Sequence, residues 1–164
     1  METNVLLNQL RDYVIANGAR AAPGASHSIL ARFESYYNVQ LPDDIRDYFL
    51  LMNGSDGSPS YGIMRFWSIE EVKTVAEEIS RTPPKAAVIQ AQYGKPFPGA
   101  EHYFVFADVL YEIQLYAIRL SPPGAGLGEI ILLDGSPPLK MANSFSHFVE
   151  LYLTSPESLR VVTN

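Results

Sequence analysis

The segment His102–Leu120 has the sequence HYFVFADVLYEIQLYAIRL, and it decides the fold class. It contains two runs rich in aromatic and β-branched residues, at positions 102–107 and 112–120. Runs of this length and composition are typical of β-strands. Only residues 108–111 separate them, and parallel neighbours need a crossover of a dozen or more residues, so we expect an antiparallel pair. The middle of the chain is therefore predicted to form an antiparallel sheet.

Further strands are expected on both sides of this pair. Gly62–Trp67 and Glu129–Leu133 are apolar at strand length, and residues 86–91 are predicted to form a short strand. The glycine-rich segment 121–128 is expected to be a flexible connection between two strands. Its glycines do not have the G-x-G-x-x-G spacing, and a strand follows instead of a helix, so phosphate binding is not expected.

Helices are expected before and after the strands. Apolar residues recur at helical spacing in each of these segments. Serines and a proline mark their starts, including a Ser68–Glu71 pair that matches the S-x-x-E capping box. Residues 20–25 have the composition of a linker, and Asn53-Gly54 predicts a helix-ending turn. The predicted helices are Val5–Ala16, a segment capped by Ser26 or Ser28 that carries Ile29 to Tyr37, Pro42–Met52, Ile69–Ser80 and Ser144–Leu153.

The order of these elements predicts the fold class. Helices come first, strands occupy the middle and one helix closes the chain, which is not the alternation of a doubly wound fold. We expect an α+β fold in which one layer of helices covers a mainly antiparallel central sheet. A length of 164 residues fits one domain with one core, so residues 1–164 are assigned to a single domain.

Composition narrows the classes of function. The chain has no cysteine, which excludes disulfides, thiolate zinc sites and a cysteine nucleophile. Its formal charge of -6 is the wrong sign for binding phosphates, so nucleic acid is not an expected partner, whereas a basic protein is compatible. There is no signal-like start and no apolar run of membrane-spanning length. We therefore expect a cytoplasmic chain with no membrane association.

Catalytic and metal-binding patterns are missing from the sequence. The three histidines lack the pairing of an H-E-x-x-H motif, and no G-x-S-x-G motif is present. Glu101 and His102 are adjacent, but neighbours in a strand point to opposite faces. Ser68 is explained by its predicted capping role. No catalytic, cofactor-binding or metal-binding residue is predicted.

Acidic side chains gather in two predicted helices. Three aspartates follow Pro42, and four glutamates lie between Ile69 and Ser80. A solvated face is the first interpretation, an acidic surface for a partner the second, and acid–base catalysis the last. Trp67 is expected in the core, whereas two tyrosines beside turns are expected to be exposed and to anchor an interface. The predicted partner-binding residues are Asp43, Asp44, Asp47, Tyr61, Glu70, Glu71 and Tyr93.

Several segments resemble one known family when they are taken in order. They are Leu41-Pro42-Asp43-Asp44, the helix into Tyr48-Phe49-Leu50-Leu51-Met52-Asn53-Gly54, Phe66-Trp67-Ser68-Ile69-Glu70-Glu71-Val72, Phe104-Val105-Phe106-Ala107-Asp108, Tyr116-Ala117-Ile118-Arg119-Leu120 and Ser144-Phe145-Ser146-His147-Phe148-Val149-Glu150. Each motif alone is common, but their order is similar to that of the SUKH superfamily, which includes bacterial immunity proteins and a fungal cell-wall assembly regulator. The resemblance covers about Ser26 to Leu153. In one departure, Val109-Leu110-Tyr111 replace the glycine-containing turn that is usual after the Phe-x-Phe-Ala-Asp strand.

The resemblance implies a non-enzymatic domain that binds another protein. The leading interpretation is an immunity protein that neutralises a cognate bacterial toxin. An intracellular regulatory adaptor of the same fold is the alternative, and an enzyme with an unrecognised site ranks third. Fold alone does not decide among them.

Overall fold

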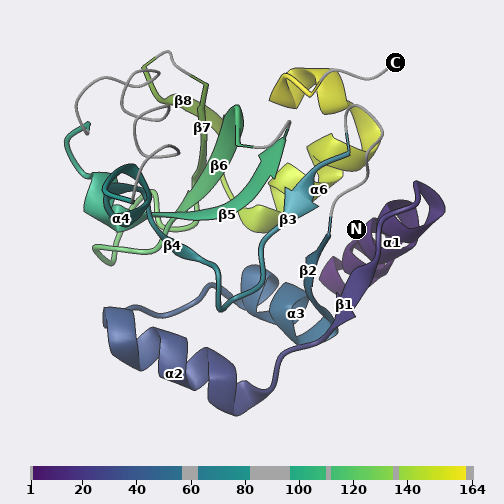
Figure 1. The fold of residues 1–164 in the computed structure, drawn as a ribbon, viewed down its shortest axis with the longest axis horizontal. Helices are drawn as coiled ribbons and strands as arrows, with labels where there is room; N and C mark the ends of the chain where they lie inside the picture. The colour runs from purple at the N-terminus through teal and green to yellow at the C-terminus, as the bar shows by residue number, and fades with distance from the viewer. Residues whose placement is uncertain (1, 57–62, 82–96, 110–111, 135–136, 162–164) are drawn as a thin grey trace.

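A computed structural model describes residues 2–56, 63–81, 97–109, 112–134 and 137–161 of the chain. The strand predicted at residues 86–91 lies outside these ranges, as do Tyr61, Tyr93 and the turn residues Leu110 and Tyr111. The described part is an α+β arrangement of five α-helices with a mainly antiparallel sheet (Figure 1). This confirms the predicted fold class.

The main sheet is built around the predicted hairpin. Strand β5 (Tyr103–Val109) pairs antiparallel with β6 (Gln114–Arg119), with Phe104 opposite Ile118. Strand β7 (Ile130–Leu133) follows β6, and β8 (Leu139–Ala142) forms one edge. The strand order is β3-β5-β6-β7-β8, and the short β4 (Lys73–Thr74) also pairs with β5. The predicted strands at 102–107, 112–120 and 129–133 are thus confirmed, whereas β8 was not predicted.

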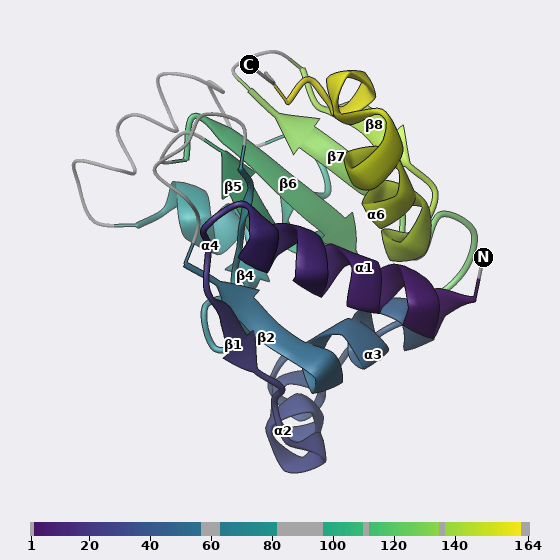
Figure 2. The same cartoon turned by 90° about the vertical axis from the view of Figure 1, so that its right-hand side faces the viewer.

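Helices α1 (Thr3–Ala16) and α6 (Phe145–Thr154) lie across one face of this sheet (Figure 2). They contact each other, and both contact α3 (Asp43–Leu51). Aromatic rings fill the space beneath them: the Phe148 ring centroid lies 5.3 Å from those of both Phe106 and Tyr116. Buried aromatic rings at this separation contribute both apolar area and edge-to-face contacts. This helix–sheet interface is the core of the domain.

Two helices remain. Helix α2 (His27–Tyr37) begins at Ser26, whose hydroxyl accepts a hydrogen bond from the backbone N–H of Ile29, so Ser26 is the cap. Helix α4 (Val75–Ile79) packs against β4, β5 and the short 3-10 helix η1 (Ala100–His102). A second 3-10 helix, η2 (Pro156–Leu159), follows α6. No helix in the described ranges is long and apolar enough to span a bilayer.

A small second sheet replaces the predicted linker and turn. Strand β1 (Ala21–Pro23) pairs antiparallel with β2 (Met52–Ser55) directly after α3. Gly54 has a φ of 90°, and a Cβ there would lie 2.8 Å from the backbone oxygen of Phe66. A glycine in a strand often marks such a close approach of two backbones. The Asn53-Gly54 pair therefore allows β2 to lie against the Phe66 backbone, where the sequence predicted a turn.

The predicted helix Ile69–Ser80 is wrong over its first half. Residues 69–71 form a turn, in which the Ser68 hydroxyl donates to a carboxylate oxygen of Glu71 over 3.0 Å. The capping box is formed by Thr74 and Glu77 instead, so α4 begins at Val75. The S-x-x-E pattern closes a turn here, because the next residues extend to pair with β5. Residue 62 of the predicted strand 62–67 lies outside the described residues, and within residues 63–67 only Arg65–Phe66 (β3) is a strand.

Candidate functional site

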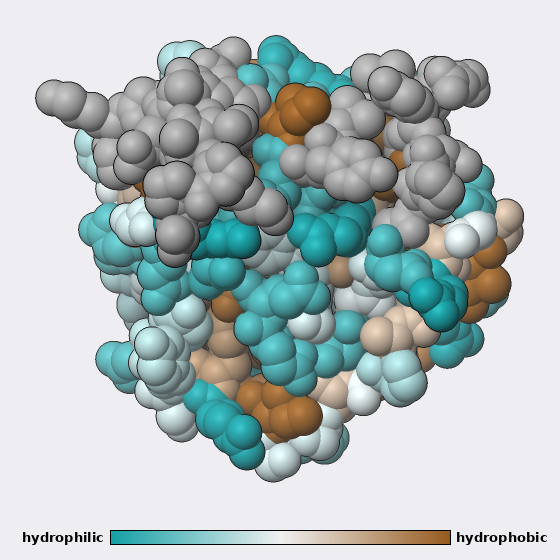
Figure 3. Space-filling model, viewed as in Figure 1, coloured by the Kyte–Doolittle hydropathy of each residue, from teal (hydrophilic) through white to brown (hydrophobic). Residues whose placement is uncertain are grey.

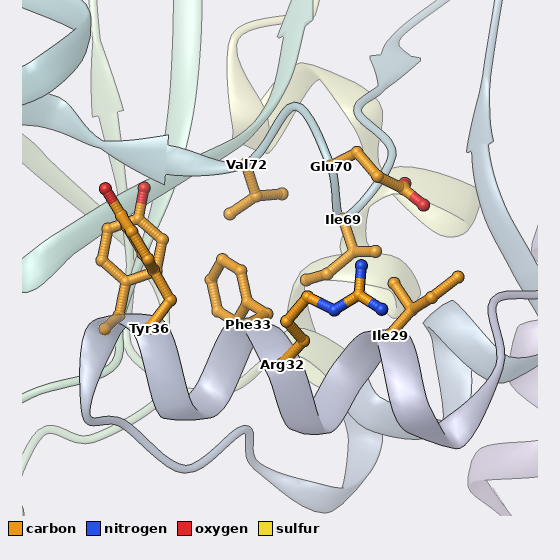
Figure 4. Close-up of a pocket in the computed structure, with 8 residues that line it drawn as sticks. Ile29, Arg32, Phe33, Tyr36, Ile69, Glu70 and Val72 are labelled. Carbon is orange, nitrogen blue, oxygen red and sulfur yellow. The ribbon is translucent and has the colours of Figure 1, made fainter.

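A groove lies between α2 and the turn that precedes β4. It has a volume of about 440 Å³. Figure 4 shows side chains from both walls facing this space, and Figure 3 shows hydrophobic surface over α2 with hydrophilic surface around it. We call this feature the α2 groove. Its lining residues are Ile29, Arg32, Phe33, Tyr36, Tyr37, Ile69, Glu70 and Val72.

One wall of the groove is a single face of α2. Ile29, Phe33, Tyr36 and Tyr37 follow the spacing that places residues on the same side of a helix. The Ser26 cap fixes the start of this helix, and Asn38, at a φ of 52°, ends it in the left-handed conformation. The wall is therefore a defined helical surface.

The opposite wall is held by the side-chain amide of Asn53. Its Oδ1 accepts a hydrogen bond from the backbone N–H of Ile69 over 2.8 Å, and its Nδ2 donates to Oε2 of Glu70 over 2.9 Å. Because Asn53 belongs to β2, the small sheet positions the turn. Ile69 is buried, and the Glu70 carboxylate is exposed but oriented by this contact.

Aromatic rings close one end of the groove. The Tyr37 ring packs edge-on against Phe104 of β5 at 4.9 Å between centroids, and its hydroxyl donates to Glu77 over 2.8 Å. Burial, followed by this hydrogen bond, raises the pKa of Tyr37 above its ordinary value. The Tyr36 ring stands edge-on to Tyr37 at 4.7 Å, yet Tyr36 is 76% exposed. Tyr36 is thus an exposed ring that packs on Tyr37, which itself packs on Phe104.

Charged groups mark the other end. Arg32 on α2 is exposed and forms no ion pair with any residue in the described ranges. Glu70 lies on the opposite wall (Figure 4). The α2 groove therefore has an apolar middle, an aromatic end and an end with one cation and one carboxylate.

The sequence-predicted acidic residues are not all in one place. Glu70 lines the groove, whereas Glu71 is exposed and contacts Arg65 at 3.4 Å. On α3, Asp43 is exposed and Asp47 half-buried. Asp44 accepts hydrogen bonds from the backbone N–H and hydroxyl of Ser146, at 2.8 and 3.1 Å, and so ties α3 to the first turn of α6. Tyr61 and Tyr93 lie outside the described residues.

The sequence did not single out Arg32, Tyr36 or Asn53 as site residues. Helical periodicity assigned Tyr36 to the apolar face of its helix, but periodicity cannot tell a core-facing residue from one that faces an open groove. Asn53 was assigned to a turn. The signal available for Tyr36 was its place in the last turn of a helix, near Asn38, a residue type that commonly ends helices.

Glu101, His102 and Ser121 form the arrangement closest to a catalytic one. His102 Nδ1 lies 3.0 Å from the Ser121 hydroxyl, and its Nε2 lies 3.5 Å from Glu101. The expectation that Glu101 and His102 point apart is wrong, because they lie in η1 and not in a strand. The Glu101 side chain is 64% exposed, so solvent weakens its interaction with His102. Within the described ranges, no group of His, Asp and Glu side chains is arranged to hold a metal ion.

Comparison with known proteins identifies a family for the chain. No curated protein matches the chain. The sequence profile of the SMI1/KNR4 family (SUKH-1) matches residues 24–151. This range contains both walls of the α2 groove and the strands from β2 to β8. The match covers well over half of the 164 residues, and the chain therefore belongs to the SMI1/KNR4 family (SUKH-1).

Proposed function

We propose that this chain is a non-enzymatic, cytoplasmic protein-binding domain that neutralises a toxin protein. Its family supports this proposal, because SUKH domains commonly serve immunity or regulation, generally without catalysis and through protein partners. Toxin neutralisation requires a surface that covers or sequesters another protein. The α2 groove is the candidate for the centre of that surface.

The observation that carries the proposal is the exposure of Tyr36 beside an apolar groove. An aromatic side chain exposed to this extent gains contact area when a partner covers it, and tyrosine is enriched among residues that dominate binding energies. The Tyr36 ring packs edge-on against Tyr37, which in turn contacts Phe104, so Tyr36 loses less rotamer freedom on binding than a side chain without such a contact. Phe33 and Ile69 extend the same apolar surface into the groove.

Acidic side chains are proposed as the rim of the interface. Asp43, Glu70 and Glu71 are exposed, Asp47 is partly so, and the whole chain carries a formal charge of -6. Charges at a rim act mainly on the rate of encounter with an oppositely charged partner. We therefore propose a basic partner. Asp44 is assigned a structural role in this proposal, because Ser146 already occupies its carboxylate.

Capture followed by a toxicity assay tests this function. The tagged chain is used to capture proteins from its source cells, and each captured protein is then expressed with and without the chain. We expect one captured protein to arrest growth alone and to be harmless when co-expressed. An Ile15→Ala variant, which alters an exposed apolar residue of α1, is the matched control and should protect as well as the wild type.

Two results would contradict the proposal. A captured partner that is harmless by itself, but whose activity changes with the chain, would support a regulatory adaptor. Conversion of the captured protein or of a small molecule by the purified chain would support an enzyme.

A further inference from the structure

The two ends of the α2 groove are complementary to different side chains of a ligand. At one end the exposed Tyr36 ring offers an apolar face. At the other, Arg32 and Glu70 stand on opposite walls (Figure 4). A ligand that matches both ends must be apolar at one end and charged at the other.

The shape of the groove fits a stretch of polypeptide. It runs along α2 from Ile29 to Tyr37, which spans about 12 Å at 1.5 Å per residue. About four residues of extended chain, at roughly 3.3 Å each, cover that length. The floor between the ends is apolar, formed by Phe33, Ile69 and Val72. Linear segments that bind in this way use a few side chains as anchors in an apolar groove.

At the charged end, the Glu70 carboxylate is already oriented in the unbound chain. Asn53 holds the Glu70 carboxylate through a 2.9 Å hydrogen bond, which reduces the freedom that Glu70 loses on pairing with a cation. Arg32 forms no ion pair with a described residue, so its charge is available to a carboxylate. The two opposite charges determine which charged side chain of a bound segment faces which wall, because the exchanged order juxtaposes like charges. The reverse direction of the segment is disfavoured because it brings the apolar anchor to the charged end and the charged side chains to Tyr36.

We propose that the α2 groove binds one linear segment of the partner protein in a fixed direction. The segment places an aromatic or large aliphatic side chain against Tyr36, a lysine or arginine against Glu70, and a carboxylate against Arg32. This proposal rests on the proposed function, because it names the part of the partner that is recognised. A second copy of the chain is the less favoured occupant, because two chains of charge -6 repel each other.

A charge-swap variant gives the sharpest test. The double variant Arg32→Glu with Glu70→Arg keeps the net charge at -6, so long-range steering is unchanged and only the local order of charges is reversed. The probe is a phage-displayed library of short random linear peptides, selected in parallel on the wild-type chain and on the swapped chain. Far-ultraviolet circular dichroism and thermal melting confirm the fold of each variant.

We expect the wild-type chain to enrich peptides with an apolar anchor, a basic residue and an acidic residue at fixed spacing. The swapped chain should enrich peptides in which the two charged positions are exchanged. Tyr36→Ala should weaken binding of the wild-type consensus peptide about tenfold, as the loss of an interface anchor does, whereas Tyr36→Phe should retain it. Identical consensus sequences on both chains, no consensus, or a dimer abolished by Tyr36→Ala would overturn the proposal.

The proposed function and this inference can fail separately. If both Tyr36→Ala and the swapped variant bind and neutralise a captured toxin as well as the wild type does, the α2 groove is not part of the interface. The proposed function would then be supported and this inference contradicted. A directional peptide consensus together with a harmless captured partner would support peptide binding by the α2 groove and would contradict toxin neutralisation.

Discussion

The indole Nε1 of Trp67 donates a hydrogen bond to Oδ2 of Asp108 over 2.6 Å. The same oxygen accepts a hydrogen bond from Arg65 Nε over 2.8 Å, and the Asp108 side chain is only 3% exposed. The Arg65 guanidinium and the Lys73 ammonium lie 5.5 and 5.8 Å from the Trp67 ring centroid, within cation–π distance. This contact joins the end of β3 to β5.

The contact belongs to a larger set of buried charges. Glu78 is fully buried and pairs with Arg81 at 2.7 Å and Lys73 at 3.5 Å. Glu112, also buried, lies 3.5 Å from Arg65. Buried carboxylates are tolerated when cations and hydrogen-bond donors surround them, and removing one member leaves an uncompensated group. The set therefore holds α4 and the β3–β5 pair together.

Replacement of Asp108 tests how much these buried charges contribute to the free energy of unfolding. Asp108→Asn keeps the shape but removes the charge that Arg65 and Trp67 share, so we expect the free energy of unfolding to fall by about 3 kcal/mol. Urea unfolding at neutral pH measures it. Glu101→Gln, a neutralisation of a mostly exposed carboxylate, is the control and should change stability by less than about 0.5 kcal/mol. Equal effects of the two variants would show that the buried contact contributes nothing.

The sequence could predict only one side of this contact. Trp67 was predicted in the core, and its burial confirms that. Its partner Asp108 is 41 positions away, and no local pattern indicates a pairing at that distance. Glu78 was counted among exposed helical carboxylates, because a spacing of charges does not reveal that Lys73 and Arg81 enclose it.

Two hydroxyl deletions distinguish the capping boxes. Thr74→Ala removes the cap of α4, so we expect a loss of about 1 kcal/mol in the free energy of unfolding. Ser68→Ala removes only a contact with the exposed Glu71 side chain and should cost about half a kcal/mol or less. Urea unfolding of both variants decides between them. A larger loss for Ser68→Ala would restore Ser68 as the helix cap.

Gly54 tests the close approach of β2 to β3. Gly54→Ala combines a positive φ with a 2.8 Å contact to backbone atoms of Phe66 and Ser68, so we expect a loss of about 3 kcal/mol. Gly124 also has a positive φ, but a Cβ there meets nothing within 4 Å, so Gly124→Ala should cost about 1 kcal/mol. Thermal melting of both variants isolates the contact. Equal losses would mean that strain alone matters at Gly54.

The small sheet shows why some elements escaped prediction. Asn53-Gly54 and the proline-containing segment 20–25 have turn and linker composition, and local preferences therefore predict no strand there. The strands β1 and β2 form because α3 brings residue 52 beside Pro23, which is a tertiary effect. Long periodic helices such as α1 and α6, and the apolar strands β5 to β7, were predictable because their patterns are strong over many residues.

Alkaline pH is expected to destabilise the chain. Burial raises the pKa of Tyr152 to about 12, compared with about 10 in the unfolded chain. Below about pH 10 the phenol is protonated in both states, and between about pH 10 and 12 the folded state binds more protons, so stability falls as pH rises. Urea unfolding at about pH 8 and about pH 11 measures this fall.

Tyr152→Phe provides the comparison. The variant loses the hydrogen bond from the Met64 backbone N–H, so it should be less stable by about 1 kcal/mol at neutral pH. It also loses the titrating group, so its stability should fall less steeply between the two pH values. A fall of the same size in both proteins would assign the alkaline effect to other groups.

The acidic rim makes a kinetic prediction about the captured partner. If the partner is basic, reversing Asp43, Asp47, Glu70 and Glu71 to lysine should slow association about tenfold at low salt and reduce its salt dependence, because these charges steer encounter. The effect should shrink between about 0.01 M and about 0.15 M salt, as the screening length falls from roughly 30 to roughly 8 Å. Stopped-flow association at both concentrations measures it. Asp44 is left unchanged because Ser146 binds it.

The matched control compares two double variants. One carries Asp43→Lys and Asp47→Lys, and the other carries Glu150→Lys and Glu157→Lys. The latter makes the same change in net charge at exposed positions of α6 and η2. Equal slowing in both double variants would show that only total charge matters, and wild-type rates in the fourfold variant, with its fold confirmed by circular dichroism, would refute the acidic rim.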